Sequence, residues 1–174
     1  METTTLEIID VIGTWIAAIG TVGAVITSLW FSLNANRDKL KIKASAMLQG
    51  SIPKKEPPLL LCVITIVNIG NIQSKINVIG WEIGRGKKKK TFIQNTNGSI
   101  QDNTPKILQQ GEEAIITFEC NDKWLNKMAK DLKGYKTKDL KVIVSTALNS
   151  FKTKIDNSLV IELEKKKNDL KENL

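Results

Sequence analysis

The chain contains no histidine, and aromatic residues make up only 5% of its 174 residues. The absence of histidine excludes Ser-His-Asp and Cys-His nucleophile arrangements, histidine-based zinc sites and the usual general base near neutral pH. The sequence shows no other pairing of a nucleophile with a base. We therefore expect a protein that is not an enzyme and that holds no metal and no cofactor.

Cysteine is also scarce, with only Cys62 and Cys120 present. Their spacing matches no metal-binding or redox motif. We expect both thiols to be reduced and buried in strands as small apolar side chains. A disulfide between them is the alternative, and it would contradict a cytoplasmic location for this part of the chain.

Charge is absent from residues 11–36, which read VIGTWIAAIGTVGAVITSLWFSLNAN. A helix of these 26 residues would be about 39 Å long, more than the ~30 Å hydrocarbon core of a bilayer. The preceding residues carry acids and no base, unlike the start of a signal peptide. We therefore predict an acidic tail over 1–10, a transmembrane helix over 11–33 and a juxtamembrane hinge over 34–39.

The charges on the two sides of this segment predict its orientation. All 26 lysines and arginines follow it, whereas Glu2, Glu7 and Asp10 precede it. The positive-inside rule then places the N-terminus outside and the rest of the chain in the cytoplasm. We expect a single-pass membrane protein with its C-terminal domain in the cytoplasm.

Small residues are concentrated on one side of the predicted helix. At 100° per residue, the small face consists of Gly13, Ala17, Gly20, Ala24 and Ser28. Small residues let two lipid-immersed helices approach closely, which predicts a homo-oligomer. The alternative is chance, because membrane helices are in general rich in glycine and alanine.

The rest of the chain has strand-like patterns and an excess of positive charge. From Arg37 onward it holds 26 basic and 15 acidic residues, a net charge of +11. Apolar or alternating runs at 40–44, 59–69, 75–83, 91–93, 114–120, 140–146 and 151–155 predict strands, and 123–133 predicts a helix in which Asn121 or Asp122 is the cap. We predict a mainly-β domain over 40–156, an antiparallel β-sandwich with one inserted short helix. Residues 157–174 form a charged tail that suits a helix or a strand, with helix favoured.

Two stretches carry a resemblance, IVNIG at 66–70 and INVIGW at 76–81. Together with IGTW at 12–15 and Leu108-x-x-Gly111-Glu112, they resemble a broad group of bacterial and phage single-pass membrane proteins with an immunoglobulin-like β-sandwich domain. The resemblance implies a membrane-tethered immunoglobulin-like sandwich and a role in phage–host conflict. It carries over no catalytic residue.

The densest positive patch in the sequence lies at 85–90. We expect an anionic surface, the head groups of the bilayer, to contact Arg37, Lys39, Arg85, Lys87, Lys88, Lys89 and Lys90. The alternative is a solvated hairpin whose charges keep its edge from pairing. Aromatic side chains for base stacking are scarce, so nucleic acid is a poor candidate partner. Trp81 and Trp124 are expected to be core residues.

These features predict a non-enzymatic membrane-anchored interaction module that self-associates through its helix and presents a basic domain to a protein partner. One alternative is a membrane-perturbing effector in which the sandwich senses a signal and clustered helices permeabilise the bilayer. The other is a tethered nucleic-acid binder, which would need tight and salt-sensitive binding.

Overall fold

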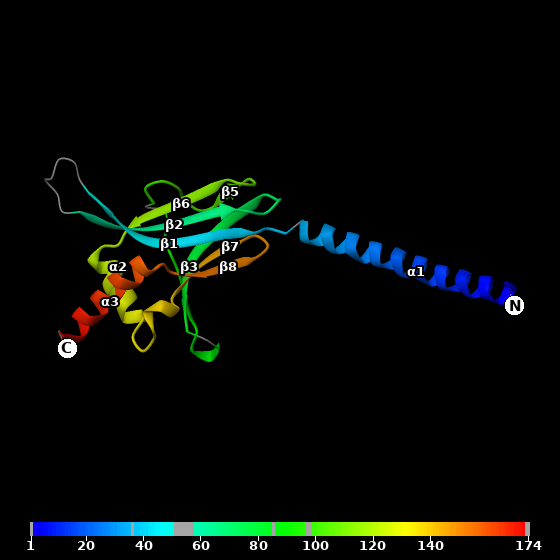
Figure 1. The fold of residues 1–174 in the computed structure, drawn as a ribbon. Helices are drawn as coiled ribbons and strands as arrows, with labels where there is room; N and C mark the ends of the chain where they lie inside the picture. Colours follow the sequence, from blue (N-terminus) through cyan, green and yellow to red (C-terminus); the bar gives the residue numbers. More distant parts are fainter. Residues whose placement is uncertain (1, 36, 51–57, 85, 97–98, 173–174) are drawn as a thin grey trace. The chain divides into compact units, whose positions relative to one another are not determined.

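The computed structural model describes residues 2–35, 37–50, 58–84, 86–96 and 99–172 (Figure 1). The chain divides into two compact units, Met1–Arg37 and Asp38–Leu174. The boundary falls inside the predicted hinge. Asp38 and Lys39 belong to the second unit, where both are hydrogen-bonded.

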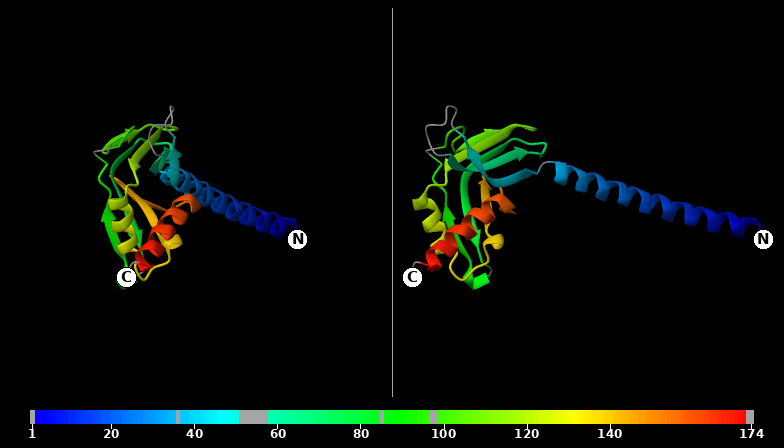
Figure 2. Two further views of the ribbon diagram at one scale, coloured as in Figure 1. Left: turned by 90° about the vertical axis from the view of Figure 1, so that its left-hand side faces the viewer. Right: turned by 60° about the vertical axis from the view of Figure 1, so that its left-hand side comes forward.

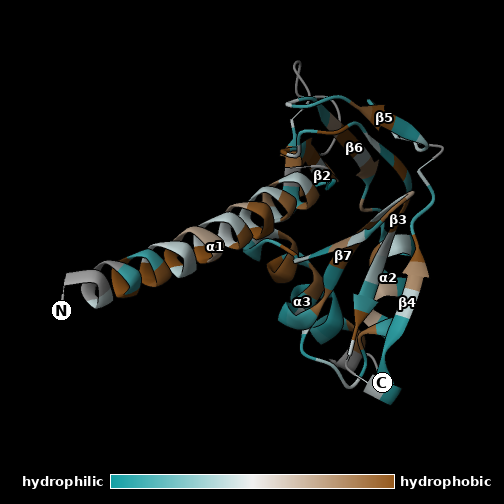
Figure 3. Cartoon of the chain, turned by 90° about the vertical axis from the view of Figure 1, so that its right-hand side faces the viewer, coloured by the Kyte–Doolittle hydropathy of each residue, from teal (hydrophilic) through white to brown (hydrophobic). Residues whose placement is uncertain are grey.

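The first unit is one helix, α1 (Glu2–Ala35). Its segment Glu7–Asn34 is 28 residues long, apolar enough to cross a membrane, and unburied within the protein. Figure 3 shows hydrophobic and neutral residues along α1 beyond its first turns. The helix begins earlier than predicted, because residues 2–10 continue it instead of forming a separate tail. Acidic residues are favourable at this end, where the helix dipole is positive.

The second unit contains two antiparallel sheets. The first has the order β1 (Leu40–Gln49), β2 (Leu59–Asn68), β6 (Glu113–Glu119). The second has the order β4 (Lys90–Ile93), β3 (Ser74–Ile83), β7 (Lys141–Thr146), β8 (Ser150–Lys154), and β5 (Lys106–Leu108) also pairs with β3. β4 pairs with the last residues of β3 and β5 with the first. The predicted central strand at 59–69 is confirmed, since β2 pairs on both edges.

The core lies between the two sheets. On β2 every second residue faces inward, so that Cys62, Ile64 and Ile66 are fully buried, as the period-two pattern of a strand requires. Ile76, Ile79 and Trp81 of β3 belong to the same buried cluster.

Two helices pack beside each other in this domain (Figure 2): α2 (Asp122–Asp131) and α3 (Asn157–Glu172). Asn121 is the cap of α2, because its side-chain oxygen accepts a hydrogen bond from the Trp124 amide at 2.9 Å. Asp156 caps α3 by accepting from the Ser158 amide at 3.1 Å, and this hydrogen bond lowers the pKa of Asp156.

The prediction of a mainly-β domain with a single inserted helix was therefore incomplete. The domain is a mixed α/β structure, and α3 is part of its core instead of a tail. The reason is that Leu159 and Leu163, one helical turn apart, are both fully buried.

Candidate functional site

The small face of α1 remains available for contact. The helix is unbroken through residues 13–28, so that the five small residues lie along one side of it. A Cβ atom added at Gly13 or Gly20 would meet nothing within 4 Å. The self-association of this face is untested and stays a prediction.

The three threonines within the apolar segment of α1 donate their hydroxyl hydrogens to the helix itself. Thr14 donates to the carbonyl of Asp10 at 2.8 Å, Thr21 to that of Ala17 at 2.8 Å and Thr27 to that of Gly23 at 2.7 Å. In a lipid environment such internal hydrogen bonds satisfy polar groups that have no water. A water-filled pore would need polar groups directed outward, so this arrangement favours a lipid-facing helix over a pore-lining one.

We call residues 86–90, at the turn from β3 into β4, the lysine tip. An ion pair with a buried carboxylate holds it to β3. Glu82, whose side chain is only 8% exposed, binds Lys89 at 2.7 Å and Lys152 at 2.8 Å. Burial raises the pKa of Glu82, but the hydrogen bonds and charges of the two lysines outweigh it, so that its pKa lies below the ordinary 4.5. The same contact with Glu82 raises the pKa of Lys89. Lys89 therefore contributes to the fold of the hairpin.

Tyr135 fixes the other side of the lysine tip. Its hydroxyl donates to the carbonyl of Lys88 at 2.7 Å, and the Lys90 ammonium lies 5.7 Å from the centre of its ring. Gly84 has a φ of +85° and no room for a Cβ against the Lys88 backbone, so this turn needs glycine. Lys87 and Lys88 keep exposed side chains, and Arg85 lies outside the described residues.

The contact with Tyr135 brings a second group of lysines to the tip. Lys133, Lys136 and Lys138 are exposed and lie within three residues of Tyr135, whose hydroxyl is hydrogen-bonded to the Lys88 carbonyl. We call these three lysines, together with Lys87 and Lys88, the basic end. A hollow of about 420 Å³ beside it is lined by Tyr135, Lys136, Thr137, Lys138, Glu164, Lys167 and Asn168. Sequence analysis missed the second group, although the spacing K-x-x-K-x-K over 133–138 was visible.

The structure does not join the predicted anionic-contact residues into one patch. Lys39 lies beside Ile69, at the turn from which β3 starts, whereas Lys87 and Lys88 follow the end of β3. β3 has ten residues, which at about 3.3 Å per residue separates its ends by roughly 30 Å. The contact with head groups remains a prediction, now for two separate patches.

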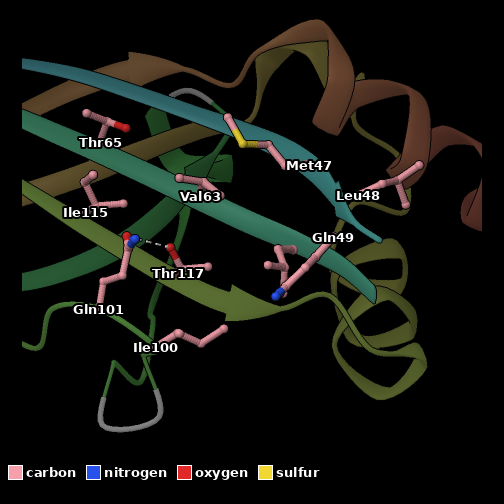
Figure 4. A pocket seen from close by; sticks show the side chains of 10 residues that line it. Met47, Leu48, Gln49, Val63, Thr65, Ile100, Gln101, Ile115 and Thr117 are labelled. Carbon is pink, nitrogen blue, oxygen red and sulfur yellow. Dashed lines mark hydrogen bonds between the residues drawn. The ribbon is translucent and has the colours of Figure 1, made fainter. Parts of the chain in front are cut away.

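An apolar groove of about 510 Å³ lies on the outer face of the three-stranded sheet (Figure 4). It is lined by Met47, Leu48, Gln49, Leu61, Val63, Thr65, Ile100, Gln101, Ile115 and Thr117, and no side chain among these is charged. The segment between β4 and β5 forms one wall, because Ile100 and Asp102 donate backbone hydrogen bonds to the carbonyls of Thr117 and Ile115 on β6. The continuous apolar run of β2 thus faces the core on one side and this groove on the other.

Trp81 and Trp124 are structural, as expected. Both indole N–H groups donate to the same Gln94 Oε1 atom, at 3.0 and 3.2 Å, and their rings meet edge to face at 5.9 Å. Trp81 is 1% exposed and Trp124 packs against the core cluster. This contact joins α2 to the five-stranded sheet.

Both cysteines are free and buried. A hydrogen bond with Cys120, together with burial, raises the pKa of Cys62 well above 9.0. A thiol held protonated in this way is a poor nucleophile. In the part of the chain that the structure describes, no group of three or more Cys, Asp or Glu side chains could hold a metal ion.

A scan against protein-family models finds no match for this chain, and a search of the curated proteins finds none either.

Proposed function

We propose that the chain is a non-enzymatic, single-pass membrane protein that associates with itself through α1 and presents the basic end of its domain to a protein partner. One observation carries the proposal: an unburied apolar segment of 28 residues, with all 26 basic residues of the chain on one side of it. An exposed apolar surface of this size is stable when lipid covers it.

The same charge asymmetry supports an orientation with the N-terminus outside and the domain in the cytoplasm of a bacterial inner membrane. Free, buried cysteines are compatible with that reducing compartment. We interpret the two sheets as an immunoglobulin-like sandwich, and we carry forward a role in phage–host conflict as part of this proposal.

The partner that suits the domain best is a protein with an acidic surface. The basic end lies at the far end of β3 from the point where α1 joins the domain. Opposite charge accelerates association and selects partners, and it adds less to the affinity itself. Arg37 and Lys39, next to the apolar segment, suit the anionic head groups of the bilayer.

The membrane part of the proposal is tested in cells that produce the full chain with a C-terminal tag. We expect the protein to stay in the membrane pellet after alkaline carbonate extraction. We also expect the tag to be digested by external protease only after the cells are opened. Recovery in the soluble fraction, or digestion of the lysine-rich domain in intact cells, would overturn it.

The partner part is tested by charge reversal at the basic end. We expect a protein that co-purifies with the full chain to be lost when Lys133, Lys136 and Lys138 are replaced by glutamate. A control variant with Lys41 and Lys75 replaced, which are exposed but lie at the starts of β1 and β3, away from the basic end, should retain it. Equal recovery with both variants would show that the basic end is not the contact.

A further inference from the structure

The end of the domain that follows α1 is built around Asp38. This residue is only 4% exposed, and its carboxylate accepts hydrogen bonds from the Thr146 hydroxyl at 2.6 Å and from the Asn149 amide. The β7–β8 turn is thereby fixed to the first residue of the domain.

A second turn is fixed to the same place. The carbonyl of Lys39 accepts from the amides of Ile69 and Gly70, at 2.9 and 3.2 Å. Asn68 is fully buried, and its side-chain amide donates to the carbonyls of Ile72 and Leu108. Its backbone carbonyl accepts a hydrogen bond from the Gly111 amide in the β5–β6 turn. We call this set, residues 38–39, 68–72, 109–112 and 146–149, the tether end.

Two large aliphatic side chains project from the tether end. Ile69 is 56% exposed and Leu148 is 69% exposed, each in a tight turn. Turns favour Gly, Pro, Asn, Asp and Ser, and the neighbours Asn71 and Asn149 follow that rule. Ile69 and Leu148 depart from it, one in each of the two turns that are bonded to residues 38–39.

The length of the connecting chain limits how far this end can be from the bilayer. Asp38 is four residues beyond Asn34, the last residue of the apolar segment, and four residues span at most about 14 Å. The head-group layer adds roughly 5–8 Å on each side of the hydrocarbon core. Asp38 is therefore kept within about 14 Å of the end of the apolar segment, in or close to the head-group layer, and the two turns bonded to it are kept close to that layer as well.

We propose that the tether end is a membrane-contact surface, in which Ile69 and Leu148 enter the head-group layer of the same bilayer that α1 spans. Lys39 is exposed beside them and suits anionic lipid. This inference rests on the proposed function, because it requires α1 to be in the membrane.

The test uses the full chain reconstituted in vesicles of phosphatidylcholine and phosphatidylglycerol. Leu148→Cys and Ile69→Cys variants are labelled separately with an environment-sensitive fluorophore, since Cys62 and Cys120 are buried. The matched control is Ile161→Cys on α3, at a position that is 63% exposed. α3 packs against η2 (Thr137–Asp139), and Lys167 donates to the Tyr135 carbonyl, so the control belongs to the opposite end of the domain.

We expect the labels at 148 and 69 to be quenched by lipids that carry a spin label on the head group, and the label at 161 to be quenched only by aqueous iodide. Equal quenching by iodide at all three positions would overturn the inference. Protection from iodide without quenching by lipid would also overturn it, since that result indicates a protein contact. A chain that does not float with the vesicles would instead refute the proposed membrane span.

Discussion

At the scale of single residues, Glu82 offsets part of the repulsion within a dense run of lysines, because it forms an ion pair with Lys89 of that run. Its carboxylate forms ion pairs with Lys89 of the β3–β4 hairpin and with Lys152 of the β7–β8 hairpin. The ion pairs are partly shielded, because the Glu82 side chain is 8% exposed while the two lysines are 43% and 35% exposed. Such shielded pairs are worth more than pairs on an open surface.

The lowered pKa of Glu82 predicts a pH dependence of stability. A carboxyl group with a folded pKa below its unfolded value stabilises the fold above the unfolded pKa, here 4.5, and this contribution is lost as pH falls through the folded value. We expect Glu82→Gln to lower the free energy of unfolding by roughly 1–3 kcal/mol at neutral pH, because two lysines lose their negatively charged partner. The measurement is denaturant unfolding of the full chain in detergent, followed by tryptophan fluorescence.

The difference between wild type and Glu82→Gln should shrink on acidification below 4.5. The control is Glu119→Gln, which changes an exposed carboxyl group on β6 and should leave stability nearly unchanged. A wild-type minus Glu82→Gln difference that stays constant from neutral to acid pH would show that the ion pairs do not stabilise the fold.

At the scale of elements, α1 and α3 differ in what covers their apolar residues. α3 buries Leu159 and Leu163 against the core of its own domain, whereas the described residues of α1 have no cover from the protein. The apolar residues of α3 are therefore covered within one chain. Those of α1 need lipid or another copy of the chain to cover them.

The small face of α1 predicts the effect of a double substitution. Gly20→Leu with Ala24→Leu places two bulky side chains where helices would approach, so we expect the oligomer in detergent to dissociate. The matched control is Val22→Leu with Ile26→Leu, on the opposite side of the helix, which should leave the oligomer intact. Size-exclusion chromatography with chemical crosslinking measures both. An unchanged size for the Gly20 and Ala24 variant would refute association through this face.

The packing of α3 predicts a loss of stability on truncation of its buried leucine. Leu163→Ala should reduce the free energy of unfolding by about 2–5 kcal/mol, because a fully buried side chain is replaced by a cavity. Ile161→Ala, on the exposed side at 63% exposure, is the matched control and should have little effect. Thermal unfolding followed by circular dichroism compares the two, and equal effects would place α3 outside the cooperative core.

At the scale of the whole molecule, charge distribution predicts which side of the membrane the domain occupies. Replacing Glu2, Glu7 and Asp10 with lysine puts positive charge on both sides of α1 and should produce a mixed orientation. The matched variant with glutamine at these positions should keep the original one. Protection of the domain from external protease in intact cells measures the fraction in each orientation. Full protection in the lysine variant would show that other signals set the topology.

Sequence patterns predicted most of this architecture, because its long elements carry strong periodicity. The continuous run of β2 and the hairpin of β7 and β8 were expected at nearly the observed residues, and the apolar run of α1 was expected within a helix that begins earlier, at Glu2. The exceptions depend on distant contacts. β5 has only three residues and exists because it pairs with β3, and the segment after β4 is positioned by hydrogen bonds to β6.

The candidate sites were less predictable for the same reason. The small face follows directly from helical spacing, whereas the basic end depends on a hydrogen bond between Tyr135 and Lys88, 47 residues apart. The groove on the three-stranded sheet was hidden because an apolar run does not reveal which of its two faces is covered.

The short connection between Ala35 and Asp38 also has a consequence for assembly. A connector of this length leaves each domain little freedom to move away from its own helix. If two copies of α1 pack together, their domains are confined to a volume in which the effective concentration of one for the other is of the order of millimolar. Contacts between domains that are too weak to form in dilute solution would then be occupied, and the avidity of the pair for a repetitive partner would rise without any new binding surface.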